Sequence, residues 1–192
     1  MQERERLMYI KIIYSNFIKN ILLLFFSFFY DKKYLDGRFF NDKRIGFIWA
    51  FKGLKRRVFK SKTSPPWPVG KNTLIGTFEN IEFDVSSLNI FQMSGCYYQA
   101  HRAKIIIGKN CEIAPNCGII TTNHDLYDIS RHSIGESVVI GDNCWIGMNS
   151  VILPGVILGD NTVVGAGSIV TKKFIEGNVV LAGNPARIIR KL

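Results

Sequence analysis

Residues 140–171 read IGDNCWIGMNSVILPGVILGDNTVVGAGSIVT, and an aliphatic side chain returns at every sixth position of this stretch. A period of six fits neither an α-helix nor a simple alternating strand. It is typical of a β-solenoid, in which each short segment ends in a turn and stacks on the segment one coil below. We therefore expect three such hexads to form one triangular coil with the aliphatic side chains inside. The repeated positions are Ile140, Ile146, Ile152, Leu158, Val164 and Val170, and glycine follows at Gly141, Gly147, Gly159 and Gly165.

The same period appears upstream at Ile107, Ile113 and Ile119, but the step from Ile119 to Ile140 is 21 residues, which is not a multiple of six. A polar insert at about residues 120–139 therefore interrupts the stack, and it holds two of the three histidines of the chain, His124 and His132. Loops on rigid scaffolds are where functional side chains concentrate. This insert is the predicted functional loop.

The chain divides at a proline-rich stretch, residues 61–68, through which no helix can continue. We expect a helical extension at residues 1–64 and the solenoid at residues 65–192. The six-residue period is weak from Val69 and is not regular through residues 84–104, called the blurred stretch below, where irregular strands and turns are expected. At the other end, Asn184-Pro185 is typical of a helix start, so a short basic C-terminal helix is predicted.

The net charge of +10 belongs to the N-terminal third: residues 1–60 hold 14 Lys or Arg and 5 Asp or Glu, and the remainder holds 11 and 10. The apolar run at residues 20–30 is shorter than the roughly 20 residues that a membrane-spanning helix needs. Basic and aromatic residues around it fit either a packed helical cap or peripheral contact with an anionic membrane. The neutral solenoid argues against nucleic-acid binding along it.

The four cysteines, Cys96, Cys111, Cys117 and Cys144, show no CxxC pairing, and the chain begins without a secretory signal pattern. We expect free thiols that serve as small packing residues, and a cytoplasmic location.

Several segments carry a resemblance to a known family: the TTNHD loop at residues 121–125, IGDNCWIG at 140–147, ILPGVILGDNTVVGAGSIVTK at 152–172 and LAGNPARIIRKL at 181–192. They resemble the left-handed parallel β-helix hexapeptide acyltransferases. Within these, the chain is most similar to the maltose and galactoside O-acetyltransferases and to relatives that acetylate capsule and other exopolysaccharide sugars. The resemblance implies a homotrimer that uses acetyl-CoA as co-substrate, needs no metal, and acetylates a sugar hydroxyl of a polysaccharide or its precursor.

The resemblance also implies a general base in the extended loop, and the matching residue is His124, flanked by Asn123 and Asp125. Imidazole suits the removal of a hydroxyl proton because it exchanges protons near neutral pH. His132 is the competing histidine. Asp125 and Asp128 are both candidates for orienting the imidazole, and backbone N–H groups near Gly147 are candidates for stabilising the oxyanion.

Acetyl-CoA lies along the solenoid edge between two subunits in that family. Trp145 would pack on the pantetheine arm, and basic side chains near the C-terminus would meet the phosphates. Met148 departs from the small residues common in relatives at that position. The matching residues here are Trp145, Gly147, Met148, Gly165, Ala166, Thr171, Lys172, Arg187 and Arg190.

Three alternatives remain at the level of sequence. The first is that the protein resembles enzymes of the same fold that acetylate antibiotics, other xenobiotics or amino-sugar nitrogens. A γ-carbonic-anhydrase-like zinc site would need all of His101, His124 and His132. A non-catalytic solenoid would lack affinity for coenzyme A.

Overall fold

The computed structural model of the protein describes residues 15–59 and 64–192. The chain divides into two compact units, Met1–Pro68 and Val69–Leu192. We call them the head and the repeat unit. The division falls at the end of the proline-rich stretch that the sequence marks as a hinge.

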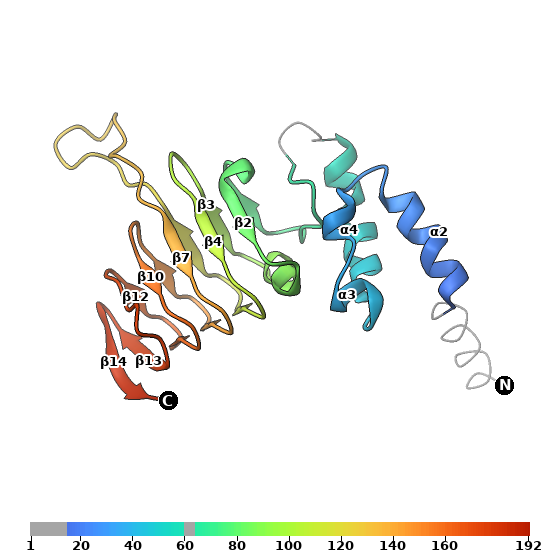
Figure 1. Cartoon of the computed structure of the whole chain (residues 1–192). Coiled ribbons are helices and arrows are strands. Elements are labelled where there is room, and N and C mark those ends of the chain that lie inside the picture. The colour runs from blue at the N-terminus through green and yellow to red at the C-terminus, as the bar shows by residue number, and fades with distance from the viewer. Residues whose placement is uncertain (1–14, 60–63) are drawn as a thin grey trace. The chain divides into compact units, whose positions relative to one another are not determined.

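The repeat unit consists of three sheets of short strands (Figure 1). The first sheet contains β1 (Leu74–Ile75), β3 (Tyr97–Gln99), β6 (Gly118–Ile120), β9 (Val151–Ile152) and β12 (Ile169–Val170). The second contains β2 (Ile81–Phe83), β4 (Ile105–Ile107), β7 (Val138–Ile140) and β10 (Ile157–Leu158). The third contains β5 (Glu112–Ile113), β8 (Trp145–Ile146), β11 (Val163–Val164), β13 (Val179–Gly183) and β14 (Ala186–Lys191).

From β4 to β12, successive strands visit the second, third and first sheets in turn, and each of them pairs in parallel with the strand one circuit away. Ile140 is paired with Leu158, and Ile146 with Val164, so one circuit takes 18 residues. Each circuit after the inserted loop therefore contains three hexads, and six residues carry the chain from one sheet to the next there.

The aliphatic residues of the hexads form the core of the repeat unit, as the sequence predicts. All nine are at most 2% exposed, because each occupies the inward-facing position of its strand. They are Ile107, Ile113, Ile119, Ile140, Ile146, Ile152, Leu158, Val164 and Val170. The four cysteines are also buried and free, which confirms the expectation of packing thiols.

The blurred stretch of the sequence, residues 84–104, contains the 3-10 helix η4 (Val85–Gln92) and β3, and a second 3-10 helix, η3 (Phe78–Asn80), precedes it. η4 replaces a strand in the first circuit and packs beside β5, where Asn89 Nδ2 donates to Glu112 Oε2 at 2.5 Å. The six-residue period is absent from this segment because η4 is a helix and not a strand.

The predicted C-terminal helix is wrong. The Asn184–Pro185 peptide bond is cis, and the chain reverses there, so that β14 pairs with β13 as an antiparallel hairpin. Ile188 and Ile189 are β-branched and favour a strand. The open edge of β13 supplies hydrogen-bonding partners that an isolated short helix would lack.

The described part of the head is helical, as predicted, with α2 (Asn16–Phe26), η1 (Lys32–Tyr34), α3 (Arg38–Asn41) and α4 (Ile45–Phe59). Ser15 Oγ caps α2 by accepting from Ile18 N at 3.2 Å. Phe47 holds the helices together, since its ring lies 6.3 Å from that of Phe26 and 5.2 Å from that of Phe40. The N-terminal part of the predicted extension, residues 1–14, and residues 60–63 lie outside the described residues.

Candidate functional site

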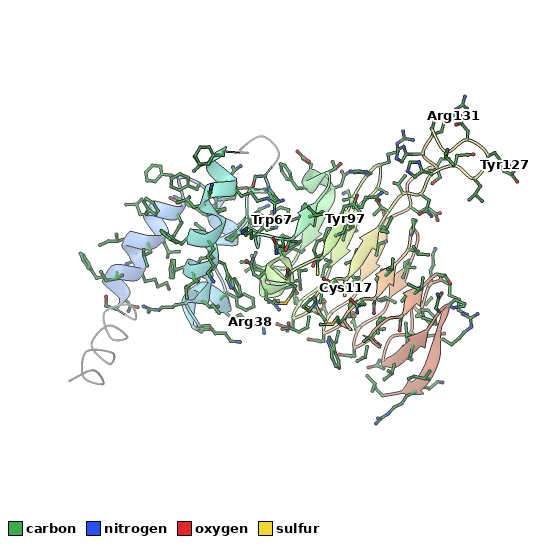
Figure 2. The ribbon with its side chains drawn as sticks, turned by 180° about the vertical axis from the view of Figure 1, so that it is seen from behind. Arg38, Trp67, Tyr97, Cys117, Tyr127 and Arg131 are labelled. Carbon is green, nitrogen blue, oxygen red and sulfur yellow. The ribbon has the colours of Figure 1, made fainter. Side chains whose placement is uncertain are left out.

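The interval between β6 and β7 is spanned by a loop, residues 121–137, that leaves the stack where the chain passes from the first sheet to the second (Figure 1). Its two arms pair as a narrow antiparallel ribbon: Ser133 N donates to Asn123 O at 2.9 Å, and Asp125 N donates to Arg131 O at 3.0 Å. Figure 2 shows Tyr127 and Arg131 at the far end of this ribbon, pointing away from the coils.

The base of the loop is tied to the coil below it. Thr121 Oγ1 donates to Gln99 O at 2.9 Å, and Lys104 N donates to Ser137 Oγ at 3.2 Å. Arg102 Nη1 reaches the backbone oxygen of His132 at 3.3 Å. These contacts fix the two arms of the ribbon where they leave the stack.

His124 lies on the first arm of the loop and is solvent-exposed. Its Nδ1 is 2.8 Å from Ile129 O. A carbonyl oxygen can only accept, so in this contact Nδ1 carries the proton, and in the neutral imidazole the free lone pair then lies on Nε2. That is the tautomer in which Nε2 can act as a base.

His132 lies opposite His124 across the ribbon. The two residues form an antiparallel bridge, and their imidazole centroids are 4.5 Å apart with 32° between the ring planes. The ring of His124 is thus held on one side by a neighbouring ring and at Nδ1 by a backbone carbonyl.

The two acidic candidates shape the loop instead of orienting the imidazole. Asp125 Oδ1 accepts from Tyr127 N at 2.8 Å and from Asp128 N at 3.0 Å. Asp128 accepts from Ser130 N and forms an ion pair with Arg131 at 3.0 Å. The orienting contact comes from Ile129 O, which sequence reasoning missed because a backbone carbonyl leaves no mark in the residue pattern.

Asn123 pairs with Ser133 through the backbone, and Ser133 Oγ also donates to Asn123 O at 3.1 Å. His101 precedes Arg102 at the same corner of the coil, one circuit below the loop, so this corner holds all three histidines of the chain. Within residues 15–59 and 64–192, no group of three or more His, Cys, Asp or Glu side chains is arranged to hold a metal ion.

Trp145 lies on the outer face of the third sheet. It is paired with Glu112 on one side and Val163 on the other, and it is 55% exposed. Met148 follows at the next corner and is also exposed. A flat aromatic surface is therefore open to solvent on this face of the stack.

Gly147 and Gly165 lie one circuit apart at the corner between the third and first sheets. A Cβ at Gly147 would lie 2.6 Å from Ala166 N and 2.7 Å from Val164 O, so only glycine fits there. Gly147 N already donates to Val164 O at 2.7 Å. This hydrogen bond engages the N–H of Gly147 itself, so the oxyanion donor that the sequence predicts near Gly147 has to be the N–H of a neighbouring residue.

Arg187 and Arg190 share the outer face of the third sheet with Trp145. Arg190 is paired with Val180 and Arg187 with Ala182, and Val180 is in turn paired with Val163 beside Trp145. Residues three apart normally point to opposite faces of a strand. A bulge in β14, where the pairing skips Ile189, brings both guanidinium groups to one face.

Thr171 and Lys172 lie elsewhere. They follow β12 at the corner between the first and second sheets, the same corner from which the loop emerges. Lys172 Nζ lies 5.5 Å from the ring centroid of Phe174. Within one chain, the predicted site residues thus fall into two groups: the loop with Thr171 and Lys172 at one corner, and the remaining residues on the third sheet and the corner that follows it.

Comparison with known proteins gives consistent matches. The family model for bacterial transferase hexapeptide (six repeats) matches residues 137–172. The chain is 50% identical over 91 residues to a Dictyostelium discoideum protein provisionally named as an acetyltransferase, covering 46% of this chain and 47% of that protein. It is 49% identical over 92 residues to the galactoside O-acetyltransferase of Escherichia coli K12, covering 46% of this chain and 44% of the relative. The matched segment therefore spans slightly less than half the length of these relatives.

A solved structure of a galactoside acetyltransferase in complex with coenzyme A aligns with a TM-score of 0.53 and 34% sequence identity, over 64% of this chain and 60% of that one. The family match and the structural match agree with the six-residue period and with the stacked, mostly parallel strands of the three sheets. Residues 137–172 of the chain are thus bacterial transferase hexapeptide repeats, and the chain is similar in sequence and in fold to the galactoside acetyltransferase structure.

Proposed function

We propose that the protein transfers an acetyl group from acetyl-CoA to a sugar hydroxyl of a cell-surface polysaccharide or its precursor, with His124 as general base. The observation that carries this proposal is the state of the His124 ring on the loop inserted into the hexapeptide stack. Its Nδ1 is engaged by Ile129 O, which leaves Nε2 to accept a proton. The named activities of the galactoside relatives support both the acetyl donor and a sugar acceptor.

The chemistry is a direct transfer. The acceptor oxygen attacks the thioester carbonyl carbon while its proton moves to His124 Nε2. The C–S bond then breaks, and the thiolate of coenzyme A leaves and takes up the proton. Because the thioester is already activated, the reaction as proposed needs neither a covalent enzyme intermediate nor a metal ion. The negative oxygen of the tetrahedral intermediate needs a donor, and with Gly147 N–H engaged, the backbone N–H of Met148 is our candidate.

For the donor, we assign Trp145 to the pantetheine arm and Arg187 and Arg190 to the phosphates of coenzyme A. The exposed indole and the two guanidinium groups share one face of the third sheet, which supports a single extended ligand along it. Gly165 and Ala166 border this face at the corner, and Thr171 and Lys172 would be met across a neighbouring subunit.

The proposal includes a left-handed β-helix and a homotrimer. His124 lies on the loop at the corner between the first and second sheets and Trp145 on the outer face of the third sheet, so a site that uses both side chains needs a second copy of the chain. The tip of the loop supports this arrangement, because Leu126 and Tyr127 are 91% and 99% exposed and would be covered against a neighbouring subunit. We place the enzyme in the cytoplasm, with residues 1–60 in contact with the membrane.

The test is turnover of acetyl-CoA by the full chain against a panel of galactosides, nucleotide sugars, oligosaccharides and lipid-linked glycans. We expect coenzyme A release that depends on one of these acceptors, with the acetyl group recovered on a sugar oxygen. Recovery on an amino nitrogen would redirect the proposal to amino-sugar acetylation. Hydrolysis alone, with every acceptor inert, would contradict it.

The shared site has its own test. His124→Ala and Trp145→Ala chains are each expected to be nearly inactive. When the two are co-expressed, mixed trimers contain sites with an intact His124 from one chain and an intact Trp145 from another, so activity should return. Recovery no greater than the sum of the separate variants would count against a site between subunits.

A further inference from the structure

The head has a row of exposed apolar side chains along one side of α2. Phe17, Ile21, Leu24 and Phe28 recur at intervals of four, three and four residues, and Phe25 lies beside them. These intervals place all five on one face of the helix and the turn that follows it. All five are exposed, with Leu24 at 64% and Phe28 at 79%. We call this row the α2 stripe.

The opposite side of α2 is the one that packs within the head. Phe26 is buried and its ring lies 6.3 Å from that of Phe47 on α4. Tyr30, just beyond α2, is buried as well and donates its hydroxyl to Ala50 O at 2.9 Å. The helix therefore already has a buried apolar face, and the α2 stripe is a second one that faces outward. A large exposed apolar surface marks an interaction site.

The head is also strongly basic. Residues 15–59 contain ten Lys or Arg and three Asp or Glu, a net charge of +7. Two heads brought together at the α2 stripe would repel each other, whereas an anionic surface would attract them. This charge favours a layer of anionic lipid over a second copy of the chain as the occupant of the stripe.

The structure brings a cation next to the stripe. A cavity of about 380 Å³ is lined by Leu23, Leu24, Ser27, Lys32, Leu35 and Asp36. Leu24 belongs to both the cavity and the stripe, and Lys32 contributes an exposed ammonium group. The Asp36 carboxylate accepts from Asn41 Nδ2 at 2.6 Å, so it is already engaged within the head. An apolar chain that ends in an anionic headgroup matches leucines beside a lysine.

The dimensions of α2 specify how it would meet a bilayer. Eleven residues give a helix about 16 Å long, roughly half the thickness of a hydrocarbon core. Among the described residues, no helix has the length and apolarity to cross a membrane. We infer that the α2 stripe inserts into the surface of an anionic lipid bilayer, with α2 parallel to the membrane plane and Lys32 at the level of the headgroups.

The test is co-sedimentation of the full chain with vesicles of phosphatidylcholine alone and of phosphatidylcholine with 30% phosphatidylglycerol, a fraction we choose as about that of an anionic leaflet. The chain should bind the anionic vesicles at low salt and be partly released as the salt concentration rises. Leu24→Glu should lower the partition coefficient about tenfold or more, because it removes apolar contact and adds a repelled charge. Binding needs neither acetyl-CoA nor acceptor, so it succeeds or fails independently of acetyl transfer.

Ile175→Glu is the matched control, since Ile175 is an exposed isoleucine of the repeat unit, 66% accessible to solvent. It should bind vesicles like the unmodified chain. Failure of the unmodified chain to bind anionic vesicles, or equal loss in both variants, would overturn the inference. A change of oligomeric state on Leu24→Glu, without a change in vesicle binding, would assign the stripe to contacts between copies and overturn it as well.

Discussion

The imidazole rings of His124 and His132 lie 4.5 Å apart across the ribbon of the inserted loop, and only His124 has its Nδ1 against a backbone carbonyl, Ile129 O. The two histidines therefore have different roles in our account. His124 presents a free Nε2, and His132 limits the rotation of the His124 ring.

A first prediction separates packing from proton transfer at position 132. His132→Phe keeps a flat ring against His124 and should retain turnover within about threefold of the unmodified enzyme. His132→Ala removes that support and should lower kcat about tenfold, with the KM for acetyl-CoA unchanged. Steady-state kinetics with both substrates varied makes the distinction. Equal loss in the two variants would mean that His132 acts through its nitrogens.

A second prediction concerns Asp125, whose carboxylate accepts from the backbone N–H groups of Tyr127 and Asp128. Asparagine offers the same acceptor oxygen, so Asp125→Asn should preserve the turn and most of the activity. Asp125→Ala frees the tip that positions Ile129 O, and kcat should fall about tenfold. A role that depends on the negative charge would instead disable Asp125→Asn as severely as Asp125→Ala.

A third prediction tests the basic face of the hairpin. Arg190 shares the outer face of the third sheet with Val180, whereas Lys191 is paired with the buried Val179. Arg190→Ala should raise the KM for acetyl-CoA about tenfold through the loss of a charge-assisted contact, and Lys191→Ala should leave it within about twofold. Isothermal titration with coenzyme A measures the same difference without an acceptor. If both variants bind coenzyme A equally well, the assignment of Arg190 to the coenzyme A site is wrong.

The core of the repeat unit could be predicted from the sequence because stacked coils require an aliphatic residue at every sixth position. Each hexad places one side chain inside the stack, and all nine aliphatic positions named from the pattern are buried. The loop was detectable for the same reason, since a step of 21 residues breaks the period.

The remaining details depend on partners that the residue pattern does not encode. Asn184-Pro185 has the composition of a helix start, but Ala186–Lys191 forms a strand because its backbone pairs with the free edge of β13. The sequence indicates an oxyanion donor near Gly147, but it cannot show that the N–H of Gly147 is bonded to Val164 O. The orientation of the His124 ring likewise depends on a main-chain carbonyl, Ile129 O, which would be present with any residue at position 129.

A fourth prediction concerns stability. Gly147→Ala would push a methyl group against Ala166 N and Val164 O, at 2.6 Å and 2.7 Å. The free energy of unfolding should fall by about 1–3 kcal/mol. At Gly118 the nearest atom to an added Cβ is Val151 Cγ1, 3.7 Å away, so Gly118→Ala should change stability little. Thermal denaturation of the two variants compares them directly. A Gly147→Ala protein as stable as Gly118→Ala would contradict the tight stacking of this corner.

The most direct test of the account is the activity of His124→Ala with the best acceptor of the sugar panel, measured together with its affinity for coenzyme A. His101→Ala is the control, because it removes an imidazole from the same corner of the stack but not from the loop. We predict that His124→Ala lowers kcat by about a hundredfold or more while coenzyme A binds within about twofold of normal, and that His101→Ala stays near the unmodified enzyme. Turnover by His124→Ala within a few-fold of the unmodified enzyme would contradict the central claim that this imidazole takes the acceptor proton.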